Sequence, residues 1–530
     1  MTTIVSPQAS DRAQHLAALA GLGQVDLAII GGGASGLGVA LDAALRGLSV
    51  VLLESHDFAK GTSSRATKLV HGGVRYLAQG NIALVREALH ERTTLLHNAP
   101  HLARPLAFVM PSYKCWETPF YGVGLKMYDA LAGKAGLGST EFLNSYKTQQ
   151  CLPGVKAQGL KGGVKYWDGQ FDDARLALAL ARTAASQGAL LLNYCPVTEL
   201  IHEQGKVAGV RCQDAETGVS YTVKAKCVVN ATGVWVDEIR HKDGAATGRS
   251  TQAMVAPSQG VHLVVDSDFL PGEHALLVPK TQDGRVLFAV PWLGKVILGT
   301  TDTPRRDLAR EPAAFAEEVE FILGEAGKYL SRAPQRSDVR SIWVGLRPLV
   351  RPPENEGGNT KKISREHTVL VSPSGLVTVT GGKWTTYRAM AEDVLDKCVE
   401  TALLPRLPPS ETSDFLLLGA ASNGSARASM ATPPGMAAYG SEAQWVQALP
   451  GADKDLAPGL SEAMVRFAAR YEYARTVEDM LARRSRLLFL DARLAAQLAP
   501  AVATILQAET GVDPQLDAFL VLTEQYLRLP

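Results

Sequence analysis

The sequence has few cysteines and no long apolar run, and both absences narrow the class of protein. Its 530 residues include six cysteines, which are scattered and never form a Cys-x-x-Cys pair. This pattern excludes a disulfide framework and a cysteine-based zinc or iron–sulfur site, so we expect buried thiols in a reducing compartment and no bound metal. No stretch has the ~18 apolar residues of a membrane-spanning helix. The nearest, residues 25–45, is interrupted by two aspartates and five glycines.

The sequence also has no excess of basic over acidic residues or of acidic over basic ones. Lys and Arg number 54 and Asp and Glu number 53, which gives a formal net charge of +1. A chain this neutral has no global field for nucleic acid, so we predict no nucleic-acid partner. Residues 1–24 have no basic segment beside an apolar core and do not resemble a secretory signal. We expect a cytoplasmic, globular protein that can lie on a membrane without crossing it.

Glycine is plentiful, and one glycine-rich turn has an informative context. The apolar run Val25–Ile30 leads directly into Gly31, Gly33 and Gly36 with G-x-G-x-x-G spacing, then a helix-like stretch, a second apolar run and Glu54. In such a strand–turn–helix–strand unit, a diphosphate approaches the glycine backbone at the amino end of the helix, and the acidic residue accepts hydrogen bonds from the adenosine ribose. We predict dinucleotide binding; the alternative is a glycine-rich loop in an ordinary βαβ unit.

Two further turns favour FAD over NAD. Residues 227–233 (CVVNATG) resemble a strand that ends in an Ala-Thr-Gly turn of the kind seen beside FAD. Residues 380–386 (TGGKWTT) lie between a predicted strand at 376–379 and a predicted helix at 387–395, and their N–H groups suit the pyrimidine edge of a flavin. The expected cofactor contacts in these turns are Thr232, Gly233, Gly382, Lys383 and Thr385. The alternative is that both turns serve only the fold.

Between these turns the sequence resembles a known family. Residues 61–77 (GTSSRATKLVHGGVRYL) look like the signature of FAD-dependent glycerol-3-phosphate dehydrogenases of the membrane-associated, quinone-linked type. Further matches follow in the family's order at residues 172–176, 260–262, 291–292, 299–302, 345–349 and 381–388. Residues 478–484 and 488–491 resemble the helical cap of the same family. Ala66 departs from the pattern, since the family usually has Ser at this position.

The resemblance implies a cofactor, a reaction and a set of partners. It implies FAD, and oxidation of sn-glycerol 3-phosphate to dihydroxyacetone phosphate by hydride transfer. It implies ubiquinone or another quinone as the electron acceptor and peripheral association with the surface of the inner (plasma) membrane, and it is compatible with a homodimer. Within residues 61–77, the expected cofactor contacts are Thr62, Ser63, Ser64, Thr67 and Gly72.

This reaction requires cations for the phosphate and a proton acceptor for the hydroxyl. A guanidinium binds phosphate oxygens in a bidentate fork, so Arg75 and Arg347, both inside matched motifs, are the predicted phosphate ligands. Lys383 adds a point charge. His262, within the apolar run GVHLVV, is the predicted proton acceptor or hydroxyl ligand, because a neutral imidazole suits a general base. The alternative for His262 is a core residue with satisfied hydrogen bonds.

Four more residues complete the candidates. His71 is the second choice for the base and lies nearer the flavin by its motif. Tyr76 is expected either to donate a hydrogen bond to the substrate or only to pack. Thr301 and Asp302 are either site residues or part of a turn at the end of a strand.

Two other functions compete with this prediction. An amino-acid or amine oxidase of the same fold would use O₂, but a carboxylate substrate needs fewer cations than Arg75, Arg347 and Lys383 provide. A non-catalytic flavin-binding scaffold would keep the Gly31 turn and lose the site, yet every site candidate is present.

The predicted fold class is α/β: an FAD-binding Rossmann-like domain with an inserted mixed β-sheet substrate domain, plus a C-terminal all-α cap. We expect a loose tail at 1–24, the two interleaved, discontinuous domains within 25–400, a linker at 401–433 and the helical domain at 434–530. Runs at 261–265, 285–290 and 295–300 are predicted strands of the substrate sheet.

Two segments allow more than one interpretation. Residues 119–137 carry Phe120, Tyr121, Lys126 and Tyr128 and fit either a helix on a membrane surface or an ordinary packed helix. Residues 483–486 contain three arginines and are interpreted as a solvated face or as a contact within the cap.

Overall fold

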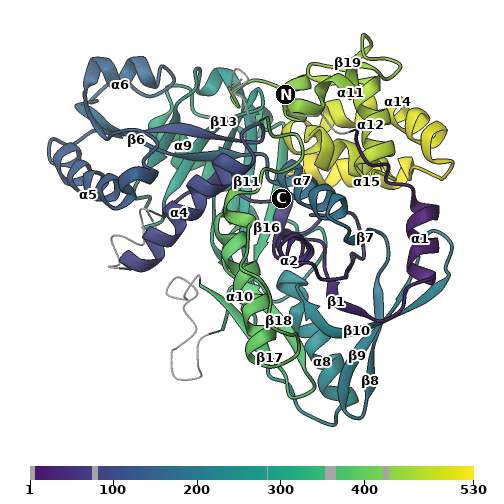
Figure 1. Ribbon diagram of the computed structural model, residues 1–530. Coiled ribbons are helices and arrows are strands. Elements are labelled where there is room, and N and C mark those ends of the chain that lie inside the picture. Colours follow the sequence, from purple (N-terminus) through teal and green to yellow (C-terminus); the bar gives the residue numbers. More distant parts are fainter. Residues whose placement is uncertain (1–5, 74–80, 283, 352–365, 422–428) are drawn as a thin grey trace.

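Two mixed β-sheets form the frame of the molecule, and helices pack around them (Figure 1). The computed structural model describes residues 6–73, 81–282, 284–351, 366–421 and 429–530. The chain passes from one sheet to the other several times, so neither sheet comes from a continuous stretch of sequence. The predicted α/β class with an inserted, mixed second sheet is confirmed.

The first sheet is built around strand β1, which precedes the Gly31 turn. β1 pairs in parallel with β2 on one side and with β10 on the other, and β10 pairs in parallel with β18. Because parallel strands end at the same edge, the turns after β1, β10 and β18 lie close together. In sheet order, followed by the adjoining hairpin, the strands are β17 (His367–Val371), β18 (Leu376–Gly381), β10 (Ser220–Asn230), β1 (Val25–Ile30), β2 (Val50–Leu53), β7 (Leu190–Leu192), β8 (Val197–Glu203) and β9 (Lys206–Gln213).

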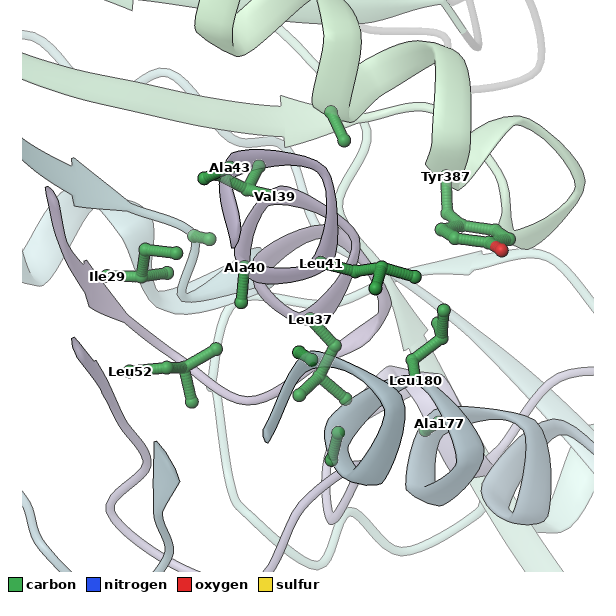
Figure 2. Close-up of a cluster of buried hydrophobic side chains, with 14 of the residues drawn as sticks. Ile29, Leu37, Val39, Ala40, Leu41, Ala43, Leu52, Ala177, Leu180 and Tyr387 are labelled. Atoms are coloured by element: carbon green, nitrogen blue, oxygen red, sulfur yellow. The ribbon is translucent and has the colours of Figure 1, made fainter. Parts of the chain in front are cut away.

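Helices cover both faces of this sheet because β1 is apolar on both. Ile29 points toward α2, which lies between the sheet and the helices α7 and α10 (Figure 2). Ile30, one residue on, packs on the opposite face with α1 and α8. The helices are α1 (Arg12–Ala20), α2 (Ala34–Leu45), α7 (Asp173–Ser186), α8 (Val236–Ala246) and α10 (Tyr387–Glu400).

The second sheet holds the strands predicted for the substrate domain. Strand β11 lies near one edge of this sheet and pairs with β14 and β15 on one side and with β16 on the other. The strands are β3 (Leu69–Val70), β4 (Ala103–Ser112), β5 (Glu141–Asn144), β6 (Gly162–Phe171), β11 (Ser258–Asp266), β12 (Ala275–Val278), β13 (Leu287–Trp292), β14 (Lys295–Gly299), β15 (Thr303–Pro304) and β16 (Ser341–Arg347). The helices beside it are α4 (Ile82–Asn98), α5 (Glu117–Ala132), α6 (Ser145–Cys151) and α9 (Ala316–Tyr329).

The C-terminal helices pack on one face of the second sheet. Val264, Trp292, Ile297 and Trp343 of the sheet belong to the same buried cluster as the helical side chains. The elements are α11 (Ala443–Gln447), β19 (Asp455–Ala457), β20 (Leu460–Ser461), α12 (Glu462–Tyr471), a π-helical turn (Asp479–Arg484), α13 (Leu487–Leu490), α14 (Ala492–Thr510) and α15 (Leu516–Leu527). Among the described residues of the predicted linker 401–433, the helical structure is a short 3-10 turn, Thr412–Asp414.

The N-terminal segment is better ordered than the loose tail that we expected. It contains α1, and Arg12 at the start of this helix forms a salt bridge of 2.5 Å with Asp214. The N–H of Ser10 donates to the carbonyl oxygen of Arg470 in the C-terminal domain, 2.8 Å away. These partners are far away in the sequence, so the composition of the segment gave no indication of them.

Two expectations from composition can be compared with the structure. The buried cysteines are Cys195, Cys212, Cys227 and Cys398, whereas Cys151 is half-buried and Cys115 is exposed. In the described ranges, every helix is too short or too polar to cross a membrane.

The three arginines of residues 483–486 are buried, so the interpretation as a solvated face is wrong. The contact within the cap is present, since Arg483 pairs with Glu478 and Asp479 (both 2.7 Å), but the arginines also reach beyond the cap. Arg483 and Arg484 donate hydrogen bonds to Asp57, which follows β2, and Arg486 donates to Asp173 at the start of α7 (3.0 Å). Burial alone raises the pKa of Asp57, but Arg484 and Arg483 outweigh it and hold this pKa below its ordinary value. The arginines thus join the C-terminal domain to the first sheet.

Removing the carboxylate of Asp57 should therefore destabilise the whole chain. An Asp57→Asn variant leaves the buried Arg484 without its carboxylate partner and removes one of the three carboxylates around Arg483, so we expect the free energy of unfolding to fall by about 3–5 kcal/mol. The matched control is Glu199→Gln, whose ion pair with Arg211 is largely exposed and should contribute less than about 1 kcal/mol. Denaturant unfolding measures both. Equal effects of the two variants would contradict a structural role for the buried pairs.

Candidate active site

A cavity of about 440 Å³ lies at the carboxyl ends of β1, β10 and β18, where the first sheet faces the second. Its first-sheet wall consists of the predicted glycine-rich turns and the segment that follows β2. Its second-sheet wall includes Gly260, His262 and Arg347. The cavity thus brings together residues that are more than 300 positions apart in the sequence.

The first glycine-rich turn has the shape of a diphosphate cradle. Gly31 has a φ of +108°, and a Cβ added to Gly36 would lie 2.0 Å from the carbonyl oxygen of Gly31, so α2 packs tightly on the turn. Gly33 caps α2 without a capping side chain, and Gly33, Ala34 and Ser35 line the cavity. The positive end of the α2 dipole is therefore presented to the cavity.

Glu54 lies at the end of β2 with its carboxylate fixed by backbone N–H groups. Oε2 accepts a hydrogen bond from the N–H of Gly32 (2.7 Å), and Oε1 accepts from the N–H of His56 (2.8 Å). A carboxylate has about four acceptor positions, so it can also accept from ribose hydroxyls. This geometry suits the ribose role predicted for Glu54.

The other two turns are tied to the signature segment and to each other. Thr380 Oγ1 donates to the carbonyl oxygen of Gly233 (3.1 Å), and Trp384 Nε1 donates to that of Ser63 (2.8 Å). Ser63 Oγ in turn accepts from the N–H of Ala34 at the start of α2 (2.9 Å). The predicted contacts that line the cavity in these three regions are Thr62, Ser63, Thr67, Thr232, Gly233, Gly382, Lys383 and Thr385.

Two residues of the signature segment point away from the cavity. Ser64 is buried, and its carbonyl oxygen accepts hydrogen bonds from Lys68 and Arg486. The N–H of Gly72 donates to Tyr128 Oη (2.8 Å). Both were expected to contact the cofactor, and neither lines the cavity.

His71 lines the cavity, as its motif suggested. The predicted phosphate ligand Arg75 and the predicted hydrogen-bond donor Tyr76 lie outside the described residues.

His262 lines the second-sheet wall and is held on two sides. Its Nε2 lies 3.0 Å from Thr67 Oγ1, and its ring stacks on Trp343 with centroids 3.9 Å apart and planes 16° apart. The register of β11 and β16 places these two aromatic residues directly opposite each other. Burial, reinforced by the cations of Lys68 and Arg347, holds the pKa of His262 well below its ordinary value of 6.5. The imidazole is therefore neutral near pH 7.

Arg347 ends β16 with its guanidinium oriented by the second sheet. Its Nη2 donates to the carbonyl oxygen of Thr301 (2.8 Å), and its Nη1 donates to that of Gln259 (3.1 Å) and lies 3.4 Å from Asp302. Thr301 and Asp302 thus help to position the arginine. Lys383 brings a second cation to the cavity from the opposite wall.

Comparisons with known proteins agree with this geometry. A family model described as "FAD dependent oxidoreductase" matches residues 26–390, and one described as "C-terminal domain of alpha-glycerophosphate oxidase" matches residues 410–516. The mitochondrial glycerol-3-phosphate dehydrogenase of Homo sapiens is 40% identical over 96% of this chain and 74% of its own length. That of Schizosaccharomyces pombe is 38% identical over 93% of this chain and 85% of its own length. The chain belongs to the family of FAD-dependent glycerol-3-phosphate dehydrogenases.

Solved structures of similar proteins support this assignment. The alignment with the glycerol-3-phosphate dehydrogenase from Bacillus halodurans, in complex with FAD, covers 98% of this chain and 98% of that one, with 31% identity and a TM-score of 0.76. The L-α-glycerophosphate oxidase from Mycoplasma pneumoniae covers 75% of this chain and 99% of its own with 16% identity and a TM-score of 0.57, which is a likeness of fold.

The cofactor of this family is FAD, and the first-sheet wall fits it. The exposed amino end of α2 suits the diphosphate, the oriented carboxylate of Glu54 suits the adenosine ribose, and the turns at Gly233 and Gly382 lie at the far end of the same cavity wall. We therefore assign the Gly31 turn, Glu54 and the two later turns as the residues that would hold FAD.

Two aromatic contributions to the site were missed in the sequence. Trp343 stacks on His262, and Trp235 lines the cavity with the guanidinium of Arg310 3.7 Å from its ring centroid. The Trp343 position depends on the register between β11 and β16, and Arg310 lies 75 residues after Trp235 in the sequence. Local sequence therefore held no signal for either contact.

Proposed function

We propose that this enzyme oxidises sn-glycerol 3-phosphate to dihydroxyacetone phosphate and passes the electrons to ubiquinone or another quinone. The observation that carries the proposal is one cavity that joins FAD-binding turns to two cations and a neutral histidine. The names of the relatives, 38–41% identical over most of the chain, agree with oxidation of glycerol 3-phosphate.

The phosphate dianion would bind beside Arg347 and Lys383. An oriented guanidinium binds phosphate oxygens with geometric selectivity, and an ammonium adds charge without a preferred direction. An amino-acid substrate would present a single carboxylate charge to these two cations. The charge of the site therefore favours the phosphorylated alcohol over the amino acid.

The substrate hydroxyl must lose a proton while its carbon loses a hydride. When bound, FAD supplies the hydride acceptor. His262 is our proton acceptor, because it lines the cavity and its imidazole is neutral near pH 7. Thr67, bonded to Nε2, fixes the ring orientation. His71, which also lines the cavity, remains the second choice.

The proposed substrate can be tested through the colour of the flavin. Without oxygen, sn-glycerol 3-phosphate should bleach the flavin band of the wild type, and a quinone should restore it. Arg347→Ala should weaken substrate binding roughly 100-fold, about 2–3 kcal/mol, and leave FAD bound. The control is Arg340→Ala. Arg340 lies directly before β16, at the opposite end of this strand from Arg347, and pairs with Asp266 at the surface. Bleaching by an amino acid instead would favour the oxidase alternative.

The role of His262 is tested by the rate of flavin reduction. His262→Asn should lower the limiting rate by roughly 10²–10⁴-fold, the range for loss of a general base, with little change in substrate affinity. In the wild type, the rate should not decline as the pH falls toward 6.5, because the pKa of His262 lies well below that value. His274→Asn, at a half-buried histidine outside the cavity wall, is the control. Flavin reduction at the wild-type rate in His262→Asn would mean that His262 is a core residue and not the proton acceptor.

Attachment to a membrane is supported by a group of exposed apolar side chains. The aromatic patch comprises Trp116, Phe120, Val123, Met127, Phe142 and Tyr146, which are 46–69% exposed. The first four recur at helical spacing from the N-cap residue of α5, Trp116, along the helix, and the last two come from β5 and α6. This end of the molecule lies away from the C-terminal helices (Figure 1).

Lysines accompany the patch, as is typical of peripheral membrane proteins. Lys126 Nζ lies 5.2 Å from the ring centroid of Phe142, and Lys114 Nζ lies 6.0 Å from that of Trp116. Tyr128, named among the candidates for membrane contact, is instead buried with its hydroxyl donating to Asp168 (2.9 Å). We propose that α5 docks on an anionic bilayer through its other face. A homodimer remains a prediction.

Loss of the patch should detach the enzyme without affecting its chemistry. The double variant Trp116→Ser/Phe120→Ser should bind vesicles of phosphatidylglycerol and phosphatidylcholine at least about tenfold more weakly. Full burial of each aromatic side chain in the bilayer would contribute about 1.5–3 kcal/mol to the free energy of binding. The control Val219→Ser changes an exposed apolar residue in the turn between β9 and β10. Co-sedimentation measures binding, and flavin bleaching by substrate serves as the activity check. Unchanged sedimentation of the double variant would contradict the proposal.

A further inference from the structure

A buried carboxylate behind the second sheet is not explained by the fold alone. Glu318, in the first turn of α9, is 5% exposed and does not line the cavity. It caps its own helix by accepting from the N–H of Phe315 (3.0 Å). No lysine, arginine or histidine in the described ranges forms an ion pair with it. A buried charge without a cation is costly, so a role beyond capping is expected.

The remaining hydrogen bonds of Glu318 gather three side chains from β11, from β15 and from the turn between β14 and β15. Its Oε1 accepts from Thr301 Oγ1 (2.8 Å) and Thr303 Oγ1 (2.6 Å). Its Oε2 accepts from Gln259 Nε2. Thr301 and Thr303 flank Asp302 at the end of β14 and the start of β15, and Gln259 belongs to β11. One carboxylate thus fixes the junction between these three strands.

The same junction holds the guanidinium of Arg347 on its other face. Arg347 donates to the backbone carbonyl oxygens of Gln259 and Thr301, and to Thr300 Oγ1 (3.2 Å). A Cβ added to Gly260 would lie 2.4 Å from Arg347 Nη2, so the guanidinium crosses β11 directly over this glycine. Glu318 and Arg347 therefore act on the same two residues, Gln259 and Thr301, from opposite sides of the sheet.

We propose that Glu318 is a positioning residue for phosphate recognition, which acts through Gln259 and Thr301 on the guanidinium of Arg347. The inference rests on the proposed function of Arg347. A carboxylate suits this role because both of its oxygens accept. A glutamine would keep one accepting oxygen for the threonines but would turn N–H donors toward Gln259 and the N–H of Phe315. The acceptors of Arg347 would then shift although no cavity residue had changed.

The first experiment compares two carboxylates of the same helix. Glu318→Gln should raise the dissociation constant for sn-glycerol 3-phosphate roughly tenfold, since small misplacements of a binding group are costly. The limiting rate of flavin reduction and the FAD content should change by less than about twofold. Glu325→Gln is the matched control: Glu325 is equally buried on α9 but binds Lys328 and the N–H of Gln282. Equal effects of the two variants would mean general loosening of α9 and would overturn the inference.

A double-mutant cycle with Arg347→Ala separates positioning from a merely structural effect. If Glu318 acts through Arg347, adding Glu318→Gln to Arg347→Ala should not weaken binding further. Additive effects would overturn the inference. Thr303→Val, which removes one donor to Glu318, provides the same comparison if Glu318→Gln folds poorly.

The same double-mutant cycle can be measured with inorganic phosphate, which binds without being oxidised. Its dissociation constant is obtained by calorimetric titration into the FAD-loaded enzyme. A wild type whose flavin is not bleached by sn-glycerol 3-phosphate would overturn the proposed function. The phosphate cycle would still decide whether Glu318 positions Arg347.

Discussion

The buried ion pairs around Asp57 are the contact on which the active-site wall depends. The segment after β2 lines the cavity with one side and binds the C-terminal domain with the other, through Asp57 with Arg483 and Arg484 and through Lys60 with Glu478 (2.7 Å). Buried charges need their partners, since an unpaired one costs several kcal/mol. The C-terminal domain thus supports the cofactor wall although none of its described residues lines the cavity.

Positive charge in and behind the cavity wall has two consequences. Lys68, buried against Asp173 (2.7 Å), lies 4.6 Å from the ring centroid of Trp343, on which His262 stacks. Burial and the positive charge of the nearby Arg486 lower the pKa of Lys68 to about 7. Arg347, which would bind the phosphate dianion, adds to burial and to Lys68 in opposing a charged imidazole at His262, so this one cation favours both the substrate and the neutral form of the base.

The parts of the fold that follow from neighbouring residues were predictable. The strand at Val25–Ile30 and its glycine-rich turn depend on contacts within one βαβ unit, and the sequence pattern located them correctly. For the arginines of residues 483–486, a contact within the cap was predictable, but the contact with Asp57 was not, because Asp57 lies more than 400 residues earlier. Ser64 and Gly72 fell within a matched motif, but spacing alone does not specify which residues of a loop point inward. For these, tertiary packing rather than local pattern decides.

The substrate side of the cavity depends on strand register. Alternate residues of β11 and β16 share one face of the sheet: His262 and Arg347 line the cavity, and Trp343 belongs to the core shared with the C-terminal helices. The residues between them, such as Val261 and Val344, belong to the core shared with α9. Because side chains alternate with a period of two, a shift of one residue would exchange the two sets. The core that holds α9 in place, and with it Glu318, therefore also fixes which side chains reach the substrate. Sheet pairing, rather than any short motif, determines this half of the site.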